Sequence, residues 1–126
     1  MVVQVIGLPC SGKTTAIKSF LENNKDIIHL DIRDYKNERD FYSIVRQSME
    51  TNKKVIAESA AGINVRNTEI IKLQATKKEL MKRSLNRDNS FDEDYLSLLE
   101  TVMLRTKYTA NNKDGLIVLL NKMFKS

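Results

Sequence analysis

A short segment near the start of the chain has residue types and spacing that suit phosphate binding. Gly7-Leu8-Pro9-Cys10-Ser11-Gly12-Lys13-Thr14 matches the pattern G-x-x-x-x-G-K-[ST]. The glycines let the backbone bend so that its N–H groups face phosphate oxygens, the lysine brings a flexible positive charge to the outer phosphates, and the threonine hydroxyl is a ligand for Mg²⁺. We therefore expect ATP and Mg²⁺ as cofactors, held by Gly7, Pro9, Cys10, Ser11, Gly12, Lys13, Thr14 and Thr15.

The segments on either side of this loop have the patterns of a strand and a helix. Residues 1–8 contain an apolar, β-branched run that predicts a buried strand. Residues 13–22 carry Ala16, Ile17 and Phe20 at helical spacing. A helix that begins directly after the loop presents its positive N-terminus to the same anion. This context favours a phosphate loop over an ordinary corner between a strand and a helix.

Strands and helices alternate along the rest of the chain. Short apolar runs predict strands over 27–31, 54–59 and 70–73, and a weaker one near 107–109. Helical spacing predicts helices over 41–49, 77–87, 93–103 and 116–124. Such alternation implies right-handed βαβ units and a parallel sheet covered on both faces. We expect one three-layer α/β domain over residues 1–126, with four to five parallel strands.

One of these helices has its own start signal. Ser90-Phe91-Asp92-Glu93 has the form of a capping box, in which the Ser and Glu side chains satisfy free backbone N–H groups. The core face predicted for the helix that follows consists of Tyr95, Leu98, Leu99, Val102 and Met103.

Composition limits the class of protein more than its function. The chain has 126 residues, a single Pro and four Gly, so we expect no long linker. The net charge of +5 suits phosphorylated ligands or nucleic acid, and equally a lysine-rich solvated surface. The one Cys excludes an intramolecular disulfide, and the apolar run at the N-terminus is too short for a signal peptide or a membrane span. We expect a cytoplasmic protein with no membrane partner.

With the phosphate loop at its N-terminus, the chain resembles the small P-loop kinases, which include nucleoside monophosphate kinases, gluconate and shikimate kinases, and the kinase domain of phage polynucleotide kinase. The resemblance rests on the loop and on segments 29–36 and 75–87. It implies a P-loop NTPase fold with a helical lid over about 76–90 and transfer of the γ-phosphoryl group of ATP. Lid arginines close over the phosphates in such kinases, and Arg83 and Arg87 have that place here.

The resemblance also implies residues for the metal and the adenine. P-loop enzymes often place a Mg²⁺-binding acid at a strand end, and Asp31 and Glu58 are the competing candidates beside Thr14. A loop before the final helix holds the adenine in these kinases, which assigns Asn111 to that role. His29 lies within an apolar run, and we interpret it as structural.

The end of the second predicted strand bears on the acceptor. In shikimate-type kinases this strand ends Asp-x-Asp, and in phage polynucleotide kinase the run is Arg-Asp-Asp-Tyr-Arg with the catalytic acid at its first Asp. Here Arg33 fills that acid's position and Asp34 follows it. A hydroxyl acceptor benefits from a carboxylate base, whereas a phosphate acceptor needs positive groups such as Arg33 and Arg66. Asp34 remains a base if the turn shifts by one residue.

We therefore predict a small acceptor, either a nucleotide or a nucleoside. Two alternatives stay open on the sequence. In the first, the basic surface follows a nucleic-acid strand and the protein is a polynucleotide 5′-hydroxyl kinase. In the second, the protein is a non-catalytic ATP-binding partner or regulatory protein, because the segment between Asp31 and Lys53 leaves little room for a large acceptor-binding insertion.

Overall fold

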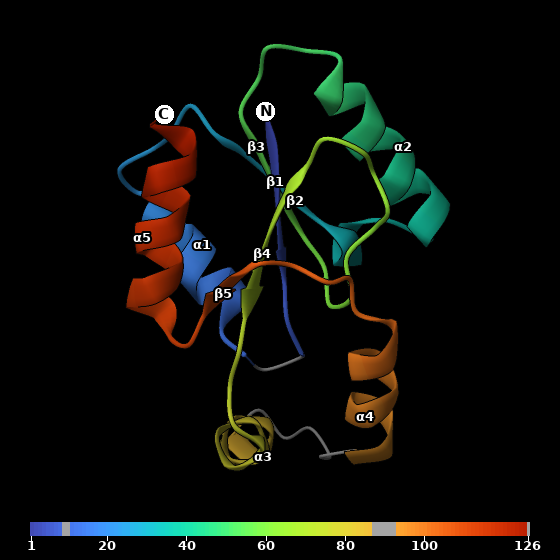
Figure 1. The fold of residues 1–126 in the computed structure, drawn as a ribbon, viewed down its shortest axis with the longest axis vertical. Coiled ribbons are helices and arrows are strands. Elements are labelled where there is room, and N and C mark those ends of the chain that lie inside the picture. The colour runs from blue at the N-terminus through green and yellow to red at the C-terminus, as the bar shows by residue number, and fades with distance from the viewer. Residues whose placement is uncertain (9–10, 87–92, 126) are drawn as a thin grey trace.

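The structure, a computed structural model, describes residues 1–8, 11–86 and 93–125. The expected contributions of Pro9, Cys10 and Arg87, and the capping box that begins at Ser90, lie outside the described residues. In chain order the elements are β1 (Val2–Ile6), α1 (Lys13–Leu21), β2 (Ile28–Asp31), the short 3-10 helix η1 (Ile32–Asp34), α2 (Glu38–Met49), β3 (Val55–Glu58), β4 (Glu69–Leu73), α3 (Lys77–Asn86), α4 (Glu93–Val102), β5 (Tyr108–Ala110) and α5 (Lys113–Phe124) (Figure 1).

The five strands form one parallel sheet in the order β2-β3-β1-β4-β5. All five residues of β1 are buried, as expected for the central strand of a sheet that is covered on both faces. Glu58 is the register partner of Val5 in β1 and of Asp31 in β2. The last residues of β1, β2 and β3 therefore meet at one edge of the sheet. The prediction of a parallel α/β sheet is confirmed.

Helices and one long connection cover the two faces of the sheet (Figure 1). α1 and α5 lie on one face, where Phe20 and Phe124 stack with ring centroids 6.1 Å apart. α2 lies on the other face and buries Phe41 and Val45 against the strands. Asn37 and Asn112 directly precede α2 and α5, and their side chains accept hydrogen bonds from backbone N–H groups in the first turns of these helices. Each helix thus follows an asparagine that acts as its N-cap. Within the described ranges, no helix has the length and apolar composition that a membrane crossing requires.

The connection between β3 and β4 has no helix, and a buried glutamine holds it against the sheet. The Nε2 of Gln4 donates to the Ile63 carbonyl at 2.8 Å and to the Thr68 hydroxyl at 3.0 Å. Its Oε1 accepts from the Ile63 N–H at 2.9 Å. Gln4 itself is fully buried. One side chain of β1 thus satisfies backbone groups that an irregular segment would otherwise leave buried without partners.

Replacing Gln4 with methionine is expected to lower the free energy of unfolding by about 2–4 kcal/mol, because the buried N–H and C=O of Ile63 both lose their partner. Methionine keeps the length of the side chain, so the cost comes from the hydrogen bonds rather than from a cavity. Urea unfolding measures the difference. Gln47→Met, on the exposed side of α2, is the matched control and should stay within about 0.5 kcal/mol of the parent. Equal stabilities for the two variants would contradict the assignment.

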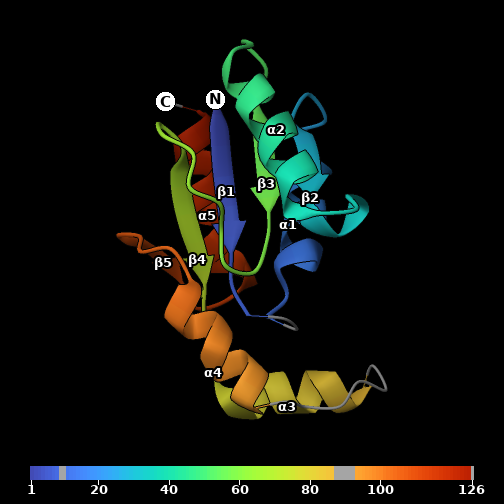
Figure 2. The same ribbon diagram turned by 90° about the vertical axis from the view of Figure 1, so that its right-hand side faces the viewer.

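α3 and α4 lie beyond the carboxyl edge of the sheet (Figure 2). The core face predicted for α4 is partly wrong, because Leu98 and Val102 are exposed. Leu99 and Met103 instead pack against Leu8 and Leu80. Because α4 lies beyond the sheet, Leu98 and Val102 of its predicted core face are left facing solvent. The side chain of Tyr95 lies outside the described part of the structure.

Candidate nucleotide and metal site

The chain turns sharply between β1 and α1, at the first glycine of the loop. The N–H of Gly7 donates to the Ala60 carbonyl at 3.0 Å, and a Cβ on Gly7 would lie 2.6 Å from the Leu73 carbonyl oxygen. At the other end of the loop, Gly12 precedes α1 with φ of 96°, in the left-handed region that glycine tolerates. Both glycines of the motif are therefore required by the local backbone.

Lys13 points back into the curve of this loop. Its ammonium donates to the Gly7 carbonyl at 2.6 Å and the Leu8 carbonyl at 3.1 Å, with the Ser11 hydroxyl at 3.5 Å. Lys13 and Ser11 are buried, whereas Thr15, in the first turn of α1, is exposed. A positive charge is thus held beside a helix N-terminus, an arrangement that attracts an anion.

The three residues expected to bind the metal come together at the strand ends. The Thr14 hydroxyl donates to Glu58 Oε2 at 2.6 Å. Asp31 and Glu58 are register partners on neighbouring strands, and both are buried. On the sequence, these two acids were alternative candidates for the acid that binds Mg²⁺, whereas the structure places both beside the loop.

His29 also belongs to this group, although its place in an apolar run predicted only a structural role. Its Nε2 lies 2.9 Å from Glu58 Oε1. The three ligand atoms, one each from His29, Asp31 and Glu58, lie within 4.8 Å of one another. Since side chains alternate across a strand, residues 29 and 31 share a face of β2. That two-residue spacing was a signal from which His29 could have been predicted.

The carboxylates of the site have lowered pKa values. Burial would raise the pKa of Asp31, but hydrogen bonds from the side chain and backbone of Arg33 lower it below its ordinary value. Burial likewise opposes ionisation of Glu58, yet hydrogen bonds from His29 and Thr14 leave its pKa lowered. The hydrogen bond with Asp31 raises the pKa of Arg33. Two ionised carboxylates beside a hydroxyl are hard oxygen donors, which fit Mg²⁺.

The residues expected to face the acceptor are not all brought together. Arg33 and Asp34 lie on η1, directly after β2, and both are exposed. Arg66 lies just before β4, whose first residue Glu69 pairs with Val3 near the start of β1. Because the strands are parallel, Arg66 lies toward the edge opposite the loop, and the structure does not bring it to this site.

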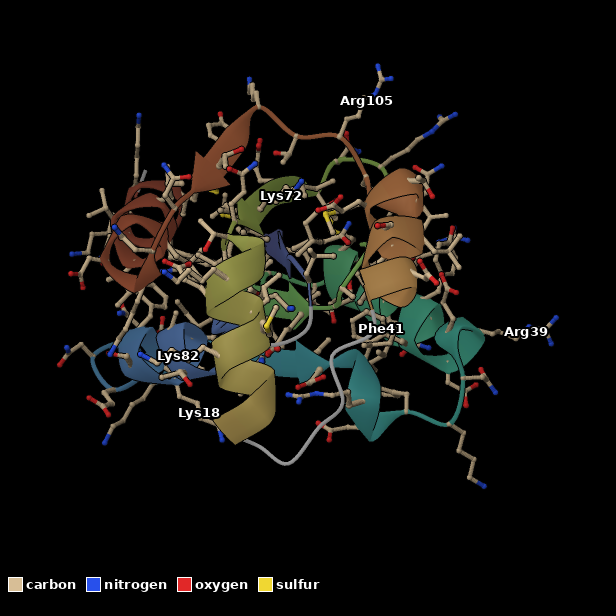
Figure 3. All side chains as sticks on the ribbon, turned by 90° about the horizontal axis from the view of Figure 1, so that it is seen from below. Lys18, Arg39, Phe41, Lys72, Lys82 and Arg105 are labelled. Atoms are coloured by element: carbon tan, nitrogen blue, oxygen red, sulfur yellow. The ribbon has the colours of Figure 1, made fainter. Side chains whose placement is uncertain are left out.

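The segment expected to act as a lid forms α3, which crosses in front of the carboxyl edge of the sheet (Figure 3). The Thr76 hydroxyl accepts from the Glu79 N–H at 3.1 Å, and Glu79 Oε2 accepts from the Thr76 N–H at 3.2 Å. This capping box has the spacing T-x-x-E, a signal that the sequence interpretation overlooked. Arg83 lies on α3, but its side chain, like the whole of Arg87, is outside the described residues.

A cavity of about 340 Å³ lies beside the loop, between the end of β4 and the first turns of α3. Asn111, which follows β5, and Leu8 of the loop both line it. Its lining further includes Leu73, Ala75, Thr76 and Glu100. The expected adenine-binding residue Asn111 is therefore placed next to the phosphate loop by the pairing of β5 with β4.

Comparison with known proteins relates the fold to a group of kinases. No protein-family model matches the sequence, and no curated protein matches it. Among solved structures, a shikimate kinase from Aquifex aeolicus matches with a TM-score of 0.64 and 13% identity over 99% of this chain and 96% of that one. A sugar kinase from a Janibacter species matches with a TM-score of 0.69 and 10% identity over 98% and 94%. A gluconokinase from Sinorhizobium meliloti matches with a TM-score of 0.58 and 14% identity over 99% and 97%. The chain therefore has the fold of the small P-loop kinases.

Proposed function

We propose that this protein is a phosphotransferase that moves the γ-phosphoryl group of ATP, with Mg²⁺, to a small acceptor. The observation that carries the proposal is the group at the strand ends, where the Thr14 hydroxyl bonds to an ionised carboxylate beside the loop that holds Lys13. An oxygen-rich cation site next to an anion site is what a magnesium nucleotide needs. The kinase names of the structural neighbours support the same reaction class.

Each part of the loop has a role in this proposal. The backbone N–H groups at the start of α1, from Gly12 to Thr15, bind the phosphates, and Lys13 exchanges its bonds to the loop carbonyls for bonds to phosphate oxygens. Thr14, Asp31 and Glu58 hold Mg²⁺, which neutralises charge on the phosphates when it is bound. Arg83 and Arg87 remain our candidates for lid residues that close over the transferred group.

The cavity between the loop and β4 is the proposed site for the nucleoside of ATP. Leu8 and Ala75 offer apolar surface for a base, and Asn111 offers an amide that donates and accepts hydrogen bonds. Thr76 also lines this cavity, so the segment that begins the proposed lid contacts the same space.

A nucleotide or nucleoside is the proposed acceptor, and we expect it to bind outside η1, which carries Arg33 and Asp34. Arg33 suits a phosphate group, because a guanidinium binds phosphate oxygens in pairs. Asp34 suits a hydroxyl group, because a carboxylate takes its proton. Both lie on η1, exposed next to the metal site.

The test supplies γ-labelled ATP and Mg²⁺ with two acceptor pools. One pool contains nucleosides, nucleotides and sugars, and the other contains oligonucleotides with 5′-hydroxyl ends. Label in the first pool supports the proposal, and label only in the second indicates a polynucleotide kinase. ATP binding with no transfer to either pool would favour a non-catalytic binding protein and contradict the proposal.

The variant Asp34→Asn separates the two acceptor chemistries within the same assay. If the acceptor is a hydroxyl, loss of the base is expected to lower turnover by about 10²-fold or more. If the acceptor is a phosphate, turnover should change by less than about threefold, because an ionised nucleophile needs no base. Asp114→Asn, in the first turn of α5, is a control of the same chemistry.

A further inference from the structure

One guanidinium reaches all three side chains that we assign to the metal. The Nε of Arg33 lies 3.1 Å from each carboxylate oxygen of Asp31, and its terminal nitrogen lies 2.5 Å from Asp31 Oδ2. The same terminal nitrogen donates to the Thr14 hydroxyl at 2.8 Å and lies 3.8 Å from Glu58 Oε2. A positive charge of the chain itself thus lies among the proposed magnesium ligands.

The local sequence explains how Arg33 returns to this position. Asp31 ends β2 and caps η1, accepting a hydrogen bond from the backbone N–H of Arg33 at 2.9 Å. That tight turn directs the side chain at position 33 back over the strand end it has just left. The Arg33 side chain is 65% exposed, whereas those of Asp31 and Glu58 are 11% and 5% exposed. The guanidinium therefore covers the carboxylates from the solvent side and can leave without disturbing the core.

We propose that Arg33 is a tethered competitor of the divalent cation, which occupies the ligands Thr14, Asp31 and Glu58 until a metal ion displaces it. The inference rests on the proposed function only in its choice of metal ligands. Two cations that share the same oxygen atoms repel each other, and Asp31 cannot keep its paired bonds to the guanidinium while it serves a metal. Displacement releases Arg33 into the space outside η1, where a negatively charged acceptor would meet it.

Competition by Arg33 predicts both the direction and the size of the change in metal affinity when Arg33 is replaced. Hydrogen bonds to charged groups are among the stronger ones in proteins, and exposure to solvent weakens them, so we expect a modest effect for this exposed guanidinium. Without the competitor, metal binding should tighten by about tenfold. Had Arg33 instead been a structural support for the carboxylates, its removal would weaken metal binding.

The first experiment measures Mn²⁺ binding without nucleotide, by the loss of the free Mn²⁺ signal in electron paramagnetic resonance. Arg33→Gln is expected to bind about tenfold more tightly than the parent, and Arg33→Lys, which keeps one charge but loses the paired geometry, to fall between them. Arg39→Gln is the control, since Arg39 is exposed on α2 and points away from the site (Figure 3). Equal or weaker binding by Arg33→Gln, or no binding by any variant, overturns the proposal.

A second readout follows Arg33 in the unaltered protein. Phenylglyoxal labels arginines, and mass spectrometry separates the label on Arg33 from that on Arg39. Saturating Mn²⁺ should speed labelling of Arg33 at least threefold, because a guanidinium released from Asp31 is more reactive, and leave Arg39 unchanged. An unchanged rate at Arg33 under Mn²⁺ saturation overturns the proposal.

Neither measurement contains ATP or an acceptor, so this inference and the proposed function can fail separately. Tighter Mn²⁺ binding by Arg33→Gln with no phosphoryl transfer by the parent would contradict the proposed function and support the competition between Arg33 and the metal ion. Phosphoryl transfer by the parent with no gain in Mn²⁺ affinity for Arg33→Gln would support the proposed function and contradict the competition.

Discussion

Replacing Lys13 with alanine is expected to lower phosphoryl transfer by about 10²–10³-fold, the loss typical of removing one preorganised electrostatic group from an active site. The ammonium already lies inside the loop, with bonds of 2.6 and 3.1 Å to the carbonyls of Gly7 and Leu8. Phosphate oxygens compete for the same donor, so little reorganisation is required when ATP binds. The measurement is label transfer from γ-labelled ATP at saturating Mg²⁺.

The control for this variant is Lys18→Ala. Lys18 lies in the last turn of the same helix and is exposed, so it tests for a general effect of lost positive charge. Transfer by this variant should stay within about twofold of the parent. Thermal unfolding with and without magnesium ATP adds a binding readout, since a ligand stabilises only a protein that binds it. A Lys13→Ala protein that is folded and fully active would remove the loop from the proposed mechanism.

The phosphate loop and the sheet could be predicted because their signals are local. The motif from Gly7 to Thr14 occupies consecutive residues, and each strand has its own apolar run. The helix α1 and its position after the loop follow from the same short stretch. The confirmed fold class thus depends on patterns that need no knowledge of distant contacts.

The metal group depends on strand order, which periodicity does not determine. Asp31 and Glu58 could be named from the sequence as acids at strand ends, but as alternatives. They meet because β2 lies next to β3 and is paired in a register that sets the two acids side by side. His29 joins them across the same pair of strands. The sequence shows which residues lie on the same face of a strand, but it does not show which neighbouring strand will pair with it.

The acceptor side was the least predictable part, for two different physical reasons. Arg33 was expected to face the acceptor, but the cap formed by Asp31 turns its guanidinium toward the metal ligands. Arg66 was grouped with it because a phosphate acceptor needs positive groups. The segment of Arg66 runs back along the sheet, held there by Gln4, and reaches the start of β4 instead. Both outcomes depend on side-chain hydrogen bonds that local propensity does not encode.

Replacing Gly7 with alanine is expected to lower the free energy of unfolding by about 3 kcal/mol and to weaken nucleotide binding at the same time. A Cβ at this position would lie 2.6 Å from the Leu73 carbonyl oxygen and 3.1 Å from the Ser11 hydroxyl. Forced overpacking costs about 1–3 kcal/mol where neighbours give way, and more where they cannot. Leu73 cannot easily move, because β4 is paired with β1 on one side and with β5 on the other.

The strain should therefore be relieved by the loop, which is the less constrained partner. Moving Gly7 displaces the carbonyl that accepts a hydrogen bond from Lys13. Overpacking at this position is therefore expected to disturb the anion site as well. Gly115→Ala is the matched control, because its Cβ would approach the Asn112 side-chain oxygen at 3.3 Å and would lie in ordinary contact with Ala110 at 3.7 Å, and alanine favours a helix. Its stability should stay within about 1 kcal/mol of the parent. Urea unfolding with and without magnesium ATP measures both effects, and a Gly7→Ala protein that keeps the parent's stability and ATP affinity would show that the loop does not need the close approach to β4.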